Sequence, residues 1–330
     1  MDEVKVSICC QTYNHEAYIE QCLDGFMMQQ VDFDFEVLVH DDASTDNTAK
    51  IIRRCERKYP GIIKTVYQQI NQFSQGVSIT QAYQFPRVQG KYIAFCEGDD
   101  YWIDPCKLQK QVDFLDNNPE FGVVYTEIDI YSEDEKQYLH SAFKNGIREH
   151  SKDFEDHLIR KGSIAPLTWV FRKTLLDKIE LFPTTDDTFI LMLEFFKYTK
   201  VHFLPDTTAV YRQRAGSVSR ETNPIKKYWY DKGVFETQKY YIEKYNMSED
   251  LADQIKSDNY FLLMKGAILA QDKNFIAEVN TFFKSKNICV QRVFGRVTRE
   301  IELEKKLNML YNHYLLKHLF RLYRKLKRKR

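Results

Sequence analysis

Three carboxylates follow an apolar stretch in the first third of the chain. Residues 90–96 read Gly-Lys-Tyr-Ile-Ala-Phe-Cys, and Glu97, Asp99 and Asp100 come directly after them. Carboxylates this close repel one another, and a divalent cation between them would hold them together. The pattern predicts a metal and phosphate site. The alternative is a solvated turn, because Asp and Gly favour turns for local reasons.

A second pair of carboxylates has the same setting. Phe35 to His40 is apolar, and Asp41 and Asp42 follow it before a helical pattern begins. In open α/β sheets, ligands bind beyond the carboxyl ends of the strands. We therefore expect both acidic clusters to lie at one edge of a sheet.

Strand and helix patterns alternate through the first 130 residues. The strands are predicted at 4–10, 35–40, 62–67 and 91–96, and the helices at about 19–27, 46–59, 77–85 and 104–117, with Asp46 and Asp104 as starting residues. Further strands are expected at 121–131, 166–171, 201–204 and 208–212. Residues 133–156 read as a polar excursion, and the chain is helical from about 225 with breaks near Asn246 and Lys286. This alternation is typical of a mostly parallel α/β sheet with helices on both faces.

Composition limits the class of protein. The chain has 330 residues, of which 43% are hydrophobic, enough for one large core and a smaller appendage. There is no uncharged apolar run of about 18 residues, and the N-terminus lacks a signal-peptide pattern, so we expect a cytoplasmic protein. The seven cysteines are scattered without paired CxxC spacing, and we expect reduced core thiols.

Charge is distributed unevenly. Residues 316–330 carry eight Lys or Arg and no acid, whereas the rest of the chain holds 40 basic and 47 acidic side chains. Leucines and aromatic residues alternate with these cations, which is typical of a helix on an anionic membrane surface. A solvated basic helix end is the alternative. Nucleic acid is not expected as a partner, because no nucleic-acid fold signature accompanies the charge.

Several of these segments together resemble the family 2 glycosyltransferases of the GT-A fold. This inverting group includes bacterial capsule, exopolysaccharide and O-antigen sugar transferases. The resemblance is carried by residues 6–14 (VSICCQTYN), 39–48 (VHDDASTDNT), 90–102 (GKYIAFCEGDDYW), 107–111 (KLQKQ) and, more weakly, 211–219 (YRQRAGSVS). It is close over the first 130 residues, loose over the next 90 and nearly absent beyond. It implies a GT-A domain over 1–222, with a nucleotide-sugar half (1–130) and an acceptor half (131–222). A helical region with a basic amphipathic tail would follow at 223–330.

The resemblance implies a role for the first acidic cluster. The family's DxD motif maps to Glu97-Gly98-Asp99, followed by Asp100, and would hold Mn²⁺ or Mg²⁺ against the diphosphate of the donor. Asp99 and Asp100 would share contacts to the metal and the ribose hydroxyls. Glu97 departs from the usual first aspartate, and we favour Asp99 and Asp100 as the ligands.

The resemblance also implies how the base of the donor is held. Asp42 would accept a hydrogen bond from the ring N–H of uracil or thymine, and Asp41 would orient the loop. Tyr13 would stack on the base, or it is simply a packed tyrosine.

The second half supplies the remaining roles. An inverting transferase needs a general base, and within residues 184–193 Asp187 matches the family's position best. The alternative is that Asp186 or Asp187 only caps the helix. Arg214 stands where the family often has a histidine, and we expect Arg214 and Arg212 to bind the diphosphate, although Arg212 could be a plain surface arginine.

These interpretations predict a metal-dependent inverting glycosyltransferase. It would transfer a sugar from a UDP- or dTDP-sugar to a hydroxyl of an acceptor such as a lipid-linked glycan, at the inner face of a bacterial membrane. A nucleotidyltransferase is one alternative, but it would carry a Gly-rich phosphate loop where this chain has residues 11–14 (QTYN). A nucleotide-sugar or glycan binding protein without catalysis is the other.

Overall fold

The computed structural model describes residues 3–162, 164–182, 184–214, 221–288, 295, 297–299 and 301–303. The chain divides into two compact units. The first comprises Met1–Glu221 with Glu236–Gln238, and the second comprises Thr222–Phe235 with Lys239–Arg330. The two units are described separately below.

The first unit is built on a sheet whose N-terminal half is parallel. Strands β1 (Val6–Thr12), β2 (Phe35–Asp41), β3 (Ile63–Tyr67) and β4 (Tyr92–Phe95) pair in the order β3-β2-β1-β4. Nearly every residue of β1, β2 and β4 is buried, as expected for strands covered on both faces. The four predicted strands of this half are therefore confirmed.

The sheet continues with antiparallel neighbours and becomes mixed. β8 (Val170–Arg172) pairs with β4, and the order proceeds through β6 (Phe121–Ser132), β9 (Lys200–Gln213) and β5 (Tyr101–Trp102), with β7 (Gln137–Leu139) paired to β6. The two strands predicted at 201–204 and 208–212 are one strand, because β6 pairs with β9 along its whole length through local register shifts. The strand predicted from Pro166 begins only at Val170, after a 3₁₀ turn at Pro166–Thr168.

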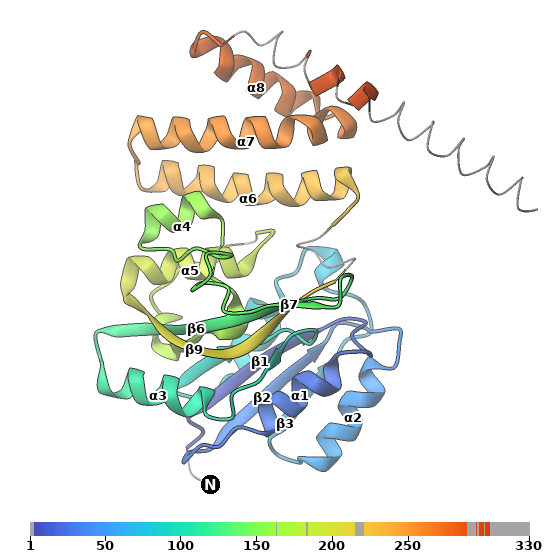
Figure 1. Cartoon of the computed structure of the whole chain (residues 1–330), viewed down its shortest axis with the longest axis vertical. Coiled ribbons are helices and arrows are strands. Elements are labelled where there is room, and N and C mark those ends of the chain that lie inside the picture. Colours follow the sequence, from blue (N-terminus) through green and yellow to red (C-terminus); the bar gives the residue numbers. More distant parts are fainter. Residues whose placement is uncertain are drawn as a thin grey trace, which may run out of the picture. The chain divides into compact units, whose positions relative to one another are not determined.

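Helices cover both faces of this sheet. They are α1 (Ile19–Met27), α2 (Thr48–Lys58), α3 (Lys107–Asn117), α4 (Phe154–Arg160) and α5 (Asp187–Tyr198). In Figure 1, α3 lies on one side of the β6–β9 pair, and α4 and α5 lie on the other. The α/β architecture with helices on both faces is thus confirmed.

Three local predictions need correction. The helix predicted over 77–85 is a π-helical turn at Thr80–Gln84 followed by a 3₁₀ turn at Phe85–Arg87. α3 begins at Lys107 because the Asp104 carboxylate closes a turn on the Cys106 N–H instead of capping the helix. The polar excursion at 133–156 contains β7 and the first residues of α4.

Helices α6 to α8 form the second unit over the described residues 224–285. They are α6 (Pro224–Lys244), α7 (Glu249–Ala270) and α8 (Lys273–Ser285), so the breaks predicted near Asn246 and Lys286 are confirmed. A further break at Gln271, with φ of 56°, has no counterpart in the prediction. Phe235, Tyr260 and Phe275 meet edge to face in the core of this unit. The basic tail at 316–330 lies outside the described residues.

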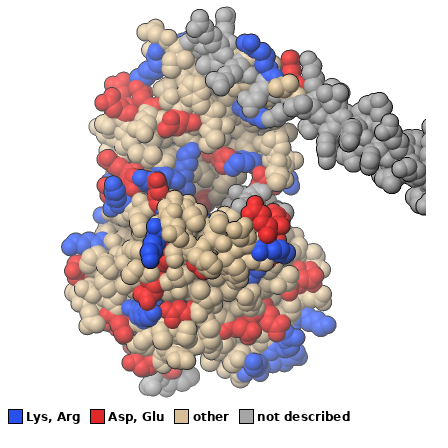
Figure 2. Space-filling view, viewed as in Figure 1, with Lys and Arg blue, Asp and Glu red and all other residues tan. Residues whose placement is uncertain are grey.

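Within the described part of the chain, no helix has the length and apolar character needed to cross a bilayer. Figure 2 shows Lys and Arg side chains interspersed with Asp and Glu on the visible face.

Candidate active site

The turns that follow β1 and β2, residues 12–14 and 42–45, are joined by hydrogen bonds and form one edge of the sheet, called the braced edge below. The Asp42 N–H donates to the Thr12 carbonyl at 2.9 Å. Asn14 and Ala43 adopt left-handed backbone conformations, with φ of 54° and 63°. Asn14 also bonds across to the second turn, through the Ser44 hydroxyl at 2.9 Å and the Thr45 N–H at 2.8 Å. Unusual backbone conformations held by their surroundings are typical of functional sites.

The acidic turn after β4 packs against this edge. A Cβ atom at Gly98 would lie 2.9 Å from the Thr12 Cβ and 3.0 Å from the His15 Nδ1, so only glycine fits here. The Gly98 N–H donates to the Gln11 carbonyl at 2.8 Å. The structure therefore brings the acidic cluster next to the end of β1, as the sequence predicts.

Asp100 faces β9. It is buried, and its Oδ1 accepts the backbone N–H of Arg212 at 2.7 Å. Burial, followed by the nearby charges of Asp99 and Glu97, raises the pKa of the Asp100 carboxyl well above its ordinary value. Asp100 thus joins the acidic turn to a strand more than one hundred residues later.

Arg212 is engaged on every nitrogen of its guanidinium. Nε donates to the Asp99 carbonyl at 2.8 Å, Nη1 to Glu133 Oε1 at 2.6 Å and Nη2 to Gln21 Oε1 at 2.7 Å. The residue is only 7% exposed, so the alternative of a plain surface arginine is wrong. These contacts favour a structural role, and a diphosphate contact by Arg212 stays a prediction.

Arg214 forms an ion pair with the acidic cluster. Its Nε donates to Asp99 Oδ2 at 2.8 Å, and its Nη2 lies 2.8 Å from His15 Nε2. Burial lowers the pKa of the His15 imidazole, which favours the neutral ring. The guanidinium is thus placed beside Asp99, where it could contact a diphosphate. The rest of this motif, residues 215–219, lies outside the described residues.

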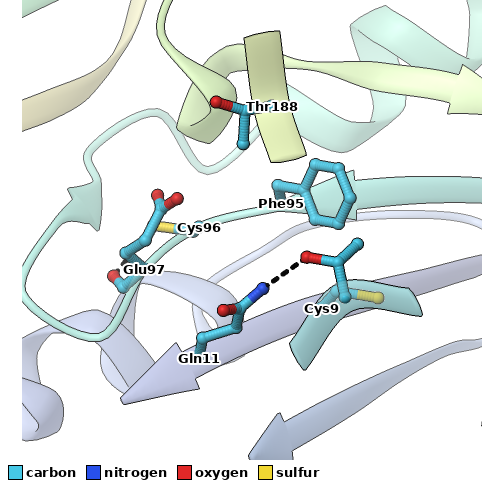
Figure 3. Close-up of a pocket in the computed structure, with 7 residues that line it drawn as sticks. Cys9, Gln11, Phe95, Cys96, Glu97 and Thr188 are labelled. Carbon is cyan, nitrogen blue, oxygen red and sulfur yellow. Dashed lines mark hydrogen bonds between the residues drawn. The ribbon is translucent and has the colours of Figure 1, made fainter. Parts of the chain in front are cut away.

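Glu97 lines a pocket at the ends of β1 and β4. The lining residues are Cys9, Gln11, Thr80, Phe95, Cys96, Glu97 and Thr188. Figure 3 shows the Glu97 carboxylate pointing toward Thr188, with Gln11 below and its hydrogen bond to Thr80 dashed. Burial, and then the charge of Asp99, raises the pKa of Glu97 to about 7.

The acidic cluster suits a divalent cation chemically, although it is not preassembled. Among the described residues, no group of three or more His, Cys, Asp or Glu is arranged to hold a metal. Burial and the charge of Asp99 raise the pKa of Glu97, and a divalent cation between these carboxylates would favour their ionised forms. Glu97 and Asp99 are the carboxylates that would hold such a cation, whereas one oxygen of Asp100 is bonded to β9.

The residues predicted to bind the nucleobase lie at the other end of the braced edge. Both oxygens of the Asp42 carboxylate accept backbone N–H groups, from Gln72 at 2.8 Å and Phe73 at 3.0 Å. Asp41 is buried and accepts the Ser44 hydroxyl. Tyr13 is 43% exposed, which contradicts the alternative of a packed tyrosine and leaves its ring open for stacking. Asp42 thus holds the 72–73 turn, and a base contact stays a prediction.

The two aspartates before α5 have different partners. Asp186 is the cap, because its Oδ1 accepts the N–H groups of Thr188 and Phe189, each at 3.0 Å. Asp187 makes no cap bond, and its Oδ2 accepts the Ser78 hydroxyl. The Asp187 carboxylate is therefore not consumed by the helix end, as a general base requires.

Several residues around this site were not singled out from the sequence. They are Gln11, His15, Ser78, Thr80 and Thr188. The contacts of these residues span large sequence separations, so no local pattern indicates them.

Residues 7–215 match the profile of "Glycosyl transferase family 2". This chain belongs to that family. The family assignment argues against the nucleotidyltransferase alternative and confirms the resemblance seen in the sequence.

Relatives of this family 2 chain come from several bacteria. An uncharacterized protein of Mycobacterium tuberculosis is 32% identical over 237 residues, which cover 69% of this chain and 64% of that protein. The match thus spans less than two thirds of that relative's length. A putative teichuronic acid biosynthesis glycosyltransferase of Bacillus subtilis, TuaG, is 34% identical over 33% of this chain and 41% of its own length.

Solved structures show the same fold. S. aureus TarS residues 1–349 in complex with UDP-GlcNAc has a TM-score of 0.60 at 21% identity, covering 89% of this chain and 83% of that chain. A mannosyltransferase of Pyrobaculum calidifontis, in complex with GDP-Man and Mn²⁺, has a TM-score of 0.52 at 19% identity, covering 85% and 84%. These neighbours support the GT-A fold of this family 2 member.

Proposed function

We propose that this chain is a metal-dependent inverting glycosyltransferase that acts on a UDP- or dTDP-sugar. The single observation that carries the proposal is the pocket where Glu97, at the end of β4, faces Thr188, at the start of α5. The first belongs to the predicted metal cluster, and the second is next to the predicted base, Asp187. A donor phosphate site close to a general base is what a single-displacement transfer needs.

The residues divide the reaction between them. Asp187 accepts the proton of the acceptor hydroxyl as its oxygen attacks the anomeric carbon. The bond from that carbon to the phosphate oxygen breaks, and the electron pair leaves with the nucleoside diphosphate. When bound, Mn²⁺ or Mg²⁺ would supply positive charge for the leaving group, held by Asp99 and Glu97 with Asp100 beside them. The Arg214 guanidinium, beside Asp99, adds a second cation.

We assign the donor and the acceptor from the chemistry of the site residues and from similar proteins. Tyr13 and Asp42 would hold a uracil or thymine ring, and the TarS complex with UDP-GlcNAc supports a uridine donor. The Mn²⁺ of the mannosyltransferase complex supports a divalent metal. Relatives named for teichuronic acid synthesis and for poly(ribitol-phosphate) glucosylation support a surface-polysaccharide acceptor. We place the enzyme in the cytoplasm, peripheral at the inner face of the membrane, with a lipid-linked glycan as acceptor.

A donor panel tests this proposal. UDP-, dTDP- and GDP-sugars would be incubated with the full chain, with Mn²⁺ or with chelator, and nucleotide diphosphate release measured with and without a lipid-linked acceptor extract. We expect release from one uridine or thymidine donor, dependent on metal and stimulated by acceptor. Donor binding without turnover under every condition would instead indicate a binding protein.

A further inference from the structure

We propose that Ser78 is a positioning residue that orients the carboxylate of Asp187 for proton abstraction. This inference rests on the proposed function, because it assumes that Asp187 is the base. It concerns a residue far from any recognised motif, in the segment between β3 and β4.

The Ser78 hydroxyl makes two hydrogen bonds, one that it accepts and one that it donates. Its oxygen accepts the backbone N–H of Gln81 at 3.1 Å, and its proton is donated to Asp187 Oδ2. The first bond fixes the hydroxyl within its own turn, so the second bond has a defined direction. Oδ2 is held in this way, and Oδ1 has no bond to Ser78 and can accept the proton of an incoming hydroxyl.

The segment that carries Ser78 is itself fixed to the sheet. It continues into the π-helical turn Thr80–Gln84, a conformation that is rare and frequent at functional sites. Thr80 accepts a hydrogen bond from Gln11 Nε2 at 2.7 Å, and Gln84 Nε2 donates to the Cys10 carbonyl at 3.0 Å. Both partners are on β1, so the position of Ser78 is set by the strand at the centre of the parallel half.

The electrostatic surroundings of Asp187 agree with this geometry. Burial raises the pKa of its carboxyl, the bond from Ser78 lowers it, and the charge of Asp186 raises it again. Burial, the charge of Asp99 and, more weakly, the charge of Asp186 raise the pKa of Glu97. The Ser78 hydroxyl therefore opposes the effects of burial and like charge on the pKa, and favours the ionised, oriented carboxylate.

The test compares Ser78→Ala with Ser78→Thr, and with Ser74→Ala as a matched control. Ser74 is exposed in the neighbouring turn and bonds only to local groups among the contacts described. The pKa of Asp187 would be measured by carboxyl ¹³C NMR, assigned by the loss of its signal in Asp187→Asn. We expect Ser78→Ala to raise this pKa by about one unit, and Ser78→Thr and Ser74→Ala to leave it near the wild-type value.

Kinetics give the second readout. With the donor found in the panel, Ser78→Ala should lower kcat about tenfold at neutral pH, move the acid limb of the pH profile upward and leave the donor KM unchanged. Ser78→Thr, which retains the hydroxyl, should keep kcat and the pH profile close to those of the wild type. The inference is overturned if the Asp187 pKa is unchanged in folded Ser78→Ala. It is also overturned if kcat falls as much in Ser78→Thr as in Ser78→Ala. If the pKa responds while Asp187→Asn keeps full turnover, the contact exists but the proposed base is wrong.

Discussion

The backbone N–H of Arg212 donates to Asp100 Oδ1 at 2.7 Å, so a carboxylate of the acidic turn holds the end of β9. This bond gives Asp100 a structural role in addition to the predicted role at the metal. The two roles respond differently to substitution, because an amide oxygen can still accept the N–H but is a poor replacement for a charged ligand.

We expect Asp100→Asn to abolish transfer while unfolding at a denaturant concentration no lower than the wild type. Asp100→Ala should abolish transfer too, and should be less stable than Asp100→Asn by about 1–3 kcal/mol, because the buried Arg212 N–H loses its partner. Asp99→Ala should likewise abolish transfer, with a loss of at most about 1 kcal/mol because its ion pair with Arg214 is partly exposed. Urea unfolding and metal-dependent nucleotide release measure both effects. Full activity in a chelator would refute the metal role.

Asp187→Asn keeps the size of the side chain but removes its basicity. Turnover should fall about 10²-fold or more, with donor affinity nearly unchanged. Asp186→Ala should instead reduce the free energy of unfolding by about 1 kcal/mol, because it removes the cap of α5. Steady-state kinetics and unfolding curves of the two variants separate base from cap. Wild-type turnover in Asp187→Asn would leave Asp187 without a catalytic role.

The pKa of Glu97, about 7 without metal, makes metal binding sensitive to pH. A cation must displace the proton below this pKa, so the apparent Mn²⁺ affinity should fall by up to about tenfold for each pH unit below 7. In Glu97→Gln the apparent Mn²⁺ affinity should be weaker than in the wild type at pH 8, and it should change little between pH 8 and the pH values below 7. Calorimetry at several pH values checks this, and an identical pH dependence in both proteins would exclude Glu97 as a ligand.

Lys107 is fully buried, with its Nζ bonded to Gln111 and 4.3 Å from the centre of the Trp102 ring. Burial lowers its pKa from 10.5 to about 7. Between these values the unfolded chain binds more protons than the folded one, so stability should rise with pH from about 7 upward.

Lys107→Met should remove this rise, which would amount to on the order of 5 kcal/mol over the whole interval between the two pKa values. Chemical denaturation from pH 6 to 9.5 gives the slope. Lys110→Met is the control, because Lys110 is exposed and paired with Asp104 and Asp206, and it should keep the wild-type slope. A variant at 107 with the same slope as the wild type would show that Lys107 stays charged in the folded protein.

The basic tail, which lies outside the described residues, carries eight cations in its last fifteen residues. Each Lys or Arg near an anionic bilayer contributes on the order of 1 kcal/mol, which falls off within a Debye length of roughly 8 Å at physiological salt. Truncation after Tyr314 should release the chain from phosphatidylglycerol vesicles in a flotation assay, and high salt should partly mimic it. Transfer to a short soluble acceptor should persist. Equal vesicle binding by both proteins would leave the tail as a solvated end.

Local sequence patterns determined the central architecture. The apolar runs before Glu97 and Asp41 predicted β4 and β2, because a strand buried on both faces needs consecutive apolar residues. The carboxylates at their ends then had to share one sheet edge. Local signals were weaker at 77–85, where a helical pattern predicted a helix but the chain forms a π turn whose Thr80 and Gln84 side chains bond to β1.

Only the tertiary structure decided between neighbouring roles. Asp186 and Asp187 are equally good caps by sequence, and they are distinguished by Ser78, which lies 109 positions away from Asp187. The guanidinium of Arg212 is likewise buried through hydrogen bonds to Asp99, Glu133 and Gln21, which come from three different segments. Hydrogen bonds between distant segments depend on how strands and helices pack, and periodicity within a segment carries no information about them.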